Sequence, residues 1–153
     1  KEIINNNNKQ LFLFFLTILY IYLYIFIFMK INYKHQHVID YLIENVVHKS
    51  NMRCKHAAAL VDNKGNIIST GYNYMIITNQ FSNRLNKKIY SIHAERDCLS
   101  KCNKKKINGC DLVVIRYGCD RFLLSQPCKD CERLINIYIK KYKLKNVYYS
   151  IEN

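Results

Sequence analysis

The sequence has few acidic residues, a single proline and no tryptophan. It contains 11 Asp and Glu against 24 Lys and Arg, which gives a formal net charge of +13 at pH 7. Such a charge favours anionic partners, namely nucleotide phosphates, nucleic acid or an acidic membrane face. A solvated, lysine-rich surface explains it equally well, because the lysines are scattered and no Arg-Gly or basic-aromatic repeat is present. The charge therefore narrows the class of partner without selecting one.

Regularly spaced cysteines are also absent. Of the seven cysteines, two form a Cys-x-x-Cys pair at Cys128 and Cys131, and the other five are irregularly placed. An odd, irregular set is not a disulfide framework, so we expect a reducing compartment. Most of these five are expected to be buried as small hydrophobic residues. They are Cys54, Cys98, Cys102, Cys110 and Cys119.

Charge is missing from Leu11 to Met29, and this apolar stretch is about as long as a membrane-spanning helix. Basic residues lie mainly on its C-terminal side, which would keep the following chain in the cytoplasm. A cleaved secretory signal would need a shorter apolar core and small residues at its end. Two interpretations of residues 1–31 stay open: a membrane anchor through residues 11–29, or upstream sequence preceding a true start at Met29. The first residue is Lys1, which allows either a fragment or an upstream start.

Residues 32–153 have the composition of one globular domain, with no internal repeat. Apolar residues at helical and strand spacing predict the order α-β-β-α-β-α-β, an α/β fold of three αβα layers with a mostly parallel region. The predicted helices are Lys34 to Lys49, Ile92 to Cys102 and a third that starts at Pro127. The predicted strands are Ala57 to Val61, Ile67 to Tyr74, Leu112 to Ile115 and Val147 to Ser150. Met75 to Tyr90 and Gly118 to Gln126 are predicted to be loops.

Two short motifs carry the chemistry. His93 and Glu95 occur in Ser-Ile-His-Ala-Glu-Arg-Asp, and Cys128 and Cys131 in Gln-Pro-Cys-Lys-Asp-Cys. One imidazole and two thiolates suit a zinc ion, and three protein ligands leave the fourth position for water, as in catalytic sites. Glu95 is then free to carry protons. Cys128 and Cys131 are also compatible with a redox pair or with half of a structural zinc knuckle.

From about Met52 to Ser150 the chain resembles the cytidine and deoxycytidylate deaminase superfamily. The superfamily also includes tRNA adenosine deaminases and polynucleotide cytidine deaminases, and its zinc signature is H-x-E followed by P-C-x-x-C. The segments that carry the resemblance are KHAAALVDNKGNIISTGYN, SIHAERDCL, QPCKDCERLI and KNVYYS. The deoxycytidylate type is the most similar, and the resemblance implies the three-layer fold with a mixed sheet.

The resemblance also implies a role for each matching residue. His93, Cys128 and Cys131 would hold one Zn²⁺, which activates a water molecule, and Glu95 would move the protons. The backbone of Ala94 would contact the base. Asn73 would contact the sugar or base, although Asn beside Gly is also common as a plain turn residue.

The resulting prediction is a hydrolytic deaminase that acts on a cytosine-type base of a nucleoside or nucleotide. A tRNA adenosine or polynucleotide cytidine deaminase is the alternative that the charge suggests, with RNA as partner. A non-catalytic zinc-binding module is an alternative of another class. The resemblance also implies a homo-oligomer. Two departures from the family are Gln126 before Pro127, and a chain that ends after its fourth predicted strand although the family sheet has a fifth.

Overall fold

Strand β5 (Asp111–Gly118) lies at the centre of the main sheet. The computed structural model describes residues 35–79 and 87–152. Residues 37–153 form one compact unit, and only two described residues, 35 and 36, belong to the other. Leu112, Val113, Val114 and Ile115 are all buried, as expected for a strand that is covered on both faces.

The sheet is mixed, and the direction in which its strands pair differs partly from the prediction. β1 (His56–Val61) pairs antiparallel with both β2 (Ile67–Tyr72) and β5, so it lies between them. The other edge of β5 is shared: β7 (Asn146–Tyr149) pairs with it in parallel, and β6 (Arg121–Leu123) pairs antiparallel. The prediction of a mostly parallel region is therefore wrong for the β1–β5 contact. β2 and β5 run in the same direction, as a strand-helix-strand unit requires, but the antiparallel β1 separates them.

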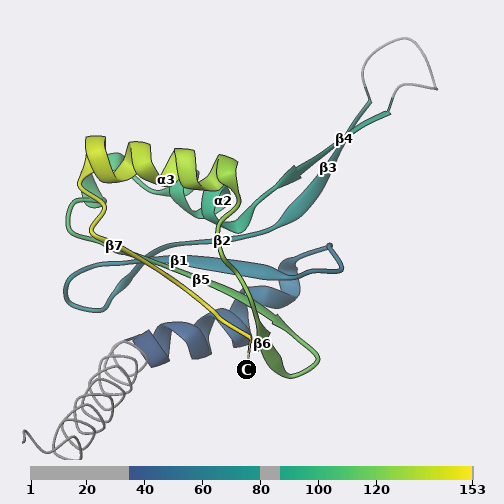
Figure 1. Ribbon diagram of the computed structural model, residues 1–153, viewed down its shortest axis with the longest axis horizontal. Helices are drawn as coiled ribbons and strands as arrows, with labels where there is room; N and C mark the ends of the chain where they lie inside the picture. The colour runs from purple at the N-terminus through teal and green to yellow at the C-terminus, as the bar shows by residue number, and fades with distance from the viewer. Residues whose placement is uncertain (1–34, 80–86, 153) are drawn as a thin grey trace, which may run out of the picture. The chain divides into compact units, whose positions relative to one another are not determined.

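Two hydrophobic clusters, one on each face of the sheet, hold the helices against it and give the three predicted layers. Alternate residues of β1 and β5 point to opposite faces. Ala58, Leu60, Leu112 and Val114 pack with helices α2 (Ala94–Lys101) and α3 (Lys129–Tyr142). The other face packs against a helix that covers residues 35–45 and against the 3₁₀ turn η1 (Val47–Lys49). Figure 1 shows α2 and α3 on the same side of the sheet.

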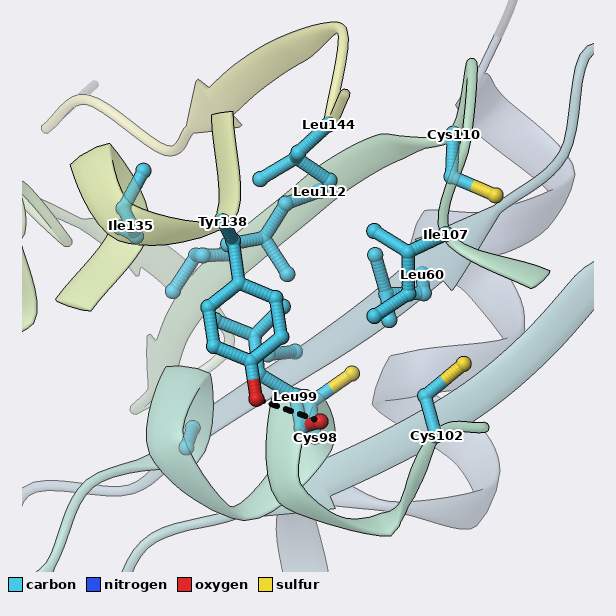
Figure 2. Packing of buried hydrophobic residues seen from close by; sticks show 13 residues of the cluster. Leu60, Cys98, Leu99, Cys102, Ile107, Cys110, Leu112, Ile135, Tyr138 and Leu144 are labelled. Atoms are coloured by element: carbon cyan, nitrogen blue, oxygen red, sulfur yellow. Dashed lines mark hydrogen bonds between the residues drawn. The ribbon is translucent and has the colours of Figure 1, made fainter. Parts of the chain in front are cut away.

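Tyr138 joins the two helices on the α2 and α3 face. Its ring points from α3 into the cluster, and its hydroxyl donates a hydrogen bond to the Leu99 carbonyl at 3.3 Å (Figure 2). Cys98, Cys102 and Cys110 are buried in the same cluster, as expected, while Cys54 and Cys119 are exposed. Burial raises the pKa of the Cys98 thiol to about 12, so this thiol is not reactive near neutral pH.

The two predicted loops contain strands. β3 (Tyr74–Asn79) and β4 (Lys87–Ile92) pair antiparallel in a separate two-stranded ribbon that extends away from the main sheet (Figure 1). The prediction missed them because this ribbon is not part of the main sheet, and Met75, Ile76 and Tyr90 stay exposed. Met75 and Ile76 are adjacent and both exposed, so these described side chains of β3 do not alternate between buried and exposed. β6 follows a two-residue hairpin turn at Cys119 and Asp120, which both have positive φ.

Gly71 fixes the distance between β2 and α2. A Cβ at this position would lie 2.3 Å from the Cys98 nitrogen and 2.5 Å from the Ala94 carbonyl oxygen, both backbone atoms of α2. We expect Gly71→Ala to lower the free energy of unfolding by about 3 kcal/mol, because the helix itself would have to move. Urea denaturation measures this. Gly118→Ala is the matched control, because no atom lies within 4 Å of its Cβ. An equal loss in both variants would contradict the packing argument.

The described part of the chain contains no helix long enough and apolar enough to cross a membrane. The candidate anchor from Leu11 to Met29 lies outside the described residues.

Candidate metal centre and active site

His93, Cys128 and Cys131 come together as the sequence predicted. The Nδ1 atom of His93 lies 3.5 Å from the Cys128 Sγ and 3.4 Å from the Cys131 Sγ. Within residues 35–79 and 87–152 these three form the one group of His, Cys, Asp or Glu residues that could hold a metal ion, with ligand atoms within 4.8 Å of one another. Ligands that are 35 positions apart in the sequence, His93 and Cys128, therefore share one site.

The geometry and chemistry of this group fit zinc. Zn–N and Zn–S bonds of about 2.05 and 2.3 Å at a tetrahedral angle separate nitrogen from sulfur by about 3.5 Å, which matches both observed distances. Cys131 is buried, whereas Cys128 is exposed, so one side of the group opens to solvent. A buried, closed set of four ligands would indicate a structural site, but three ligands with an open side suit a catalytic one.

Each ligand helix begins at the metal group. His93 is the N-cap of α2 and Cys128 is the N-cap of α3, and neither side chain caps its helix with a hydrogen bond. Both side chains are thus free to turn toward each other. Pro127 precedes the N-cap, so the prediction that it occupies the first helical turn is wrong by two residues. A proline at N′ still suits the extended backbone that leads into the cap.

Cys131 has surroundings that oppose its ionisation. Burial, together with the charges of Glu95 and Cys128, raises the pKa of the Cys131 thiol. A divalent cation at this point would reverse the balance, since it neutralises the thiolates that bind it. The donor set therefore fits a bound zinc ion.

Glu95 lies beside the ligands but is not one of them. Its side chain is 5% exposed, and it contacts the Cys131 thiol closely enough to hydrogen-bond with it. Its position in the first turn of α2 follows directly from its spacing of two residues from His93. A buried carboxylate adjacent to a metal group can exchange protons with a molecule bound there.

Helix α2 is held on β2 by polar contacts as well as by packing. The buried Asp97 carboxylate accepts a hydrogen bond from the Tyr72 nitrogen at 3.2 Å and forms an ion pair with Lys101 at 2.6 Å. The Ser69 hydroxyl donates to the Cys98 carbonyl at 2.9 Å. These hydrogen bonds and the ion pair hold α2 against β2 and so fix the position of its N-terminus relative to the end of that strand.

Ser125 and Ser150 hold the segment that leads to Cys128. The Ser125 nitrogen donates to the Ser150 carbonyl at 2.9 Å, and the Ser150 nitrogen donates to the Ser125 hydroxyl at 2.8 Å. The Ser125 hydroxyl in turn donates to the Val114 carbonyl at 3.0 Å. This segment is thereby fastened to β5 only three residues before the metal ligand. The sequence carried no signal for it beyond the two serines themselves.

Residues 33–150 match the family described as the cytidine and deoxycytidylate deaminase zinc-binding region. The chain belongs to this family. Among solved structures, the chain is similar to the 1.6 Å crystal structure of cytidine deaminase from Burkholderia pseudomallei, with 21% identity and a TM-score of 0.36. That match covers 58% of this chain and 65% of the other, less than two thirds of its length. No curated protein matches the sequence.

Asn73, which family resemblance links to the substrate, is engaged by the protein. Its Oδ1 accepts hydrogen bonds from the His56 nitrogen at 2.8 Å and the Ser50 hydroxyl at 2.7 Å. Its Nδ2 donates to the Cys54 carbonyl at 2.6 Å and to the Met52 sulfur at 3.2 Å. Asn73 therefore secures the segment that precedes β1. Its contact with a substrate stays a prediction, as does that of the buried Ala94, the first residue of α2.

Two residues near the site, His56 and Arg116, were not indicated by the sequence. Burial lowers the pKa of His56, while the charges of Glu95, Arg116 and His93 act on it in both directions. Because these charges act on it, His56 lies near Glu95 and the metal ligand His93. His56 stands alone at the start of one strand, and Arg116 stands alone within another. Neither belongs to a spaced motif that could have indicated its nearness to the site.

Proposed function

We propose that the chain is a zinc-dependent hydrolytic deaminase that converts a cytosine-type base of a nucleoside or nucleotide to uracil, with release of ammonia. The observation that carries the proposal is the buried Glu95 beside the three metal ligands. A structural zinc site has no use for a buried carboxylate that does not bind the metal. The family match supports the same chemistry.

His93, Cys128 and Cys131 would hold the zinc ion, which supplies a water activated for attack on the ring carbon that bears the amine. Glu95 accepts a proton from that water and gives it to the ring nitrogen. Glu95 then passes the second proton to the departing amine, which leaves as ammonia, so that one water is consumed for each ammonia released. The first N–H groups of α2, including that of Ala94, have no intrahelical partner and are suited to orient a base oxygen.

The β3–β4 ribbon supports a second candidate, a deaminase that acts on RNA. The ribbon begins directly after Asn73 and ends directly before His93, so it borders the site on the chain. Its exposed Met75, Ile76 and Tyr90 offer apolar and aromatic contacts, and Tyr90 could stack on a base. The net charge of +13 favours the same partner.

The test is ammonia release from a panel of cytidine, deoxycytidine, their monophosphates, and single-stranded and transfer RNA, with the zinc content measured on the same protein. Turnover of the small substrates that is indifferent to added RNA supports the first candidate. Deamination of RNA, with binding that weakens steeply as salt rises, supports the second. Zinc without turnover of any base would contradict both and favour the non-catalytic module. Self-association stays a prediction that light scattering measures.

A further inference from the structure

His56 and Arg116 lie side by side on the face of the sheet that carries the metal site. They are paired across β1 and β5. Each is two residues from a member of the cluster beneath α2 and α3, Ala58 and Val114 respectively, so side-chain alternation places them on that face. His56 is the first residue of β1, and its backbone is hydrogen-bonded to Asn73, which directly follows β2. Both residues therefore lie at the end of the sheet where α2 begins.

Arg116 has hydrogen-bonding capacity that the protein does not use. Its Nε is buried and has no hydrogen-bond partner among the described residues. Its Nη2 donates to the Cys54 sulfur at 3.2 Å, and a thiol is a weak acceptor. Among residues 35–79 and 87–152, no carboxylate forms an ion pair with Arg116.

A partly buried guanidinium without an anionic partner destabilises the folded protein unless a bound ligand supplies the anion. Burial of a charged group away from water is unfavourable without a hydrogen-bonded counter-charge. Guanidinium groups match phosphate geometry with two parallel hydrogen bonds, which a neutral ligand does not offer. Arg116, Glu95 and His93 lie near enough to His56 for their charges to act on it, so the guanidinium and the metal group border the same imidazole.

We propose that Arg116 binds the phosphate of the substrate and makes the site selective for a nucleoside monophosphate over the free nucleoside. This rests on the proposed function and names the substrate class of the same site. His56, which is half-buried, stands beside it across β1 and β5. A site that binds the cytosine-type base of both substrates would thus distinguish them by the phosphate, which only the monophosphate carries.

The test compares wild type with Arg116→Ala, Arg116→Lys and Arg121→Ala. Arg121 is the matched control, because it is an exposed arginine of β6 and its loss changes the net charge equally. For Arg116→Ala we expect kcat/KM for cytidine monophosphate to fall roughly 10- to 100-fold, as for loss of a charge-assisted hydrogen bond, with cytidine changed less than about threefold. Arg116→Lys should lie between, and Arg121→Ala should match wild type.

A second readout separates failure of this inference from failure of the proposed function. Calorimetry measures the binding of uridine monophosphate and of uridine to the same four zinc-loaded proteins, and thermal unfolding shows whether each is folded. Binding of the monophosphate that weakens only in the Arg116 variants supports the inference even if no base is deaminated. Equal losses for both ligands, no loss for either, no preference for the monophosphate in wild type, or no binding would each overturn it.

Discussion

Glu95→Gln should retain one zinc ion per chain and lose deaminase turnover by about 10³-fold. The amide has nearly the same shape as the carboxylate but accepts no proton, so the transfer from water to the base and to the leaving amine is lost. The ligands His93, Cys128 and Cys131 are untouched, so the metal content should stay that of wild type. Steady-state ammonia release and elemental analysis of the purified protein measure the two quantities.

Glu132→Gln is the control for Glu95→Gln. Glu132 lies in the first turn of α3, next to Cys131, but is exposed. Its replacement removes the same charge near the same ligands, and we expect turnover within about twofold of wild type because exposed charges act weakly in water. If Glu95→Gln turns over as fast as this control, Glu95 is not the proton carrier and the mechanism is wrong.

Cys128→Ser and Cys131→Ser should each reduce the zinc content from one ion per chain to nearly none and abolish turnover. A hydroxyl remains protonated where a thiolate binds, so each variant loses one of three ligands. None of the three metal ligands belongs to either hydrophobic cluster, so the variants should keep their secondary structure and unfold at a lower temperature. Zinc analysis, circular dichroism and thermal unfolding measure these outcomes.

Cys119→Ser is the control for the ligand variants, because Cys119 is exposed in the β5–β6 turn and contacts no ligand. It should bind zinc and turn over as wild type does. A chelator should reproduce the effect of the ligand variants in wild type, and added zinc should reverse it. A thiol–disulfide protein would behave differently: Cys128 and Cys131 would oxidise reversibly with no metal bound, and that result would contradict the zinc centre.

The metal ligands could be predicted because their spacing is local. Cys128 and Cys131 are three residues apart, a spacing that keeps two side chains on one side of a helix start. His93 and Glu95 lie in one turn. The helices and the buried strand β5 could likewise be read from apolar spacing, because burial against a core imposes a period on neighbouring residues.

The sheet order was beyond such reasoning. β1 and β2 form the expected hairpin, but nothing in either strand indicates that β5 will pair with the free edge of β1 and run antiparallel to it. The β3–β4 ribbon was missed for a related reason, since an exposed ribbon outside the main sheet does not need alternating apolar residues. Pairing depends on contacts between distant segments, which local pattern does not record.

The sequence by itself determined the chemistry: an imidazole, two thiols and a carboxylate at spacings that suit one zinc ion and one proton carrier. The tertiary structure decided what surrounds them. It placed Arg116 beside His56, which lies 60 positions away in sequence, and it engaged the side chain of Asn73 in four hydrogen bonds. The ligand spacing can be recognised in the sequence because helix geometry is local, whereas the neighbourhood of His56 and Arg116 is made by strand pairing, which only the folded chain brings about.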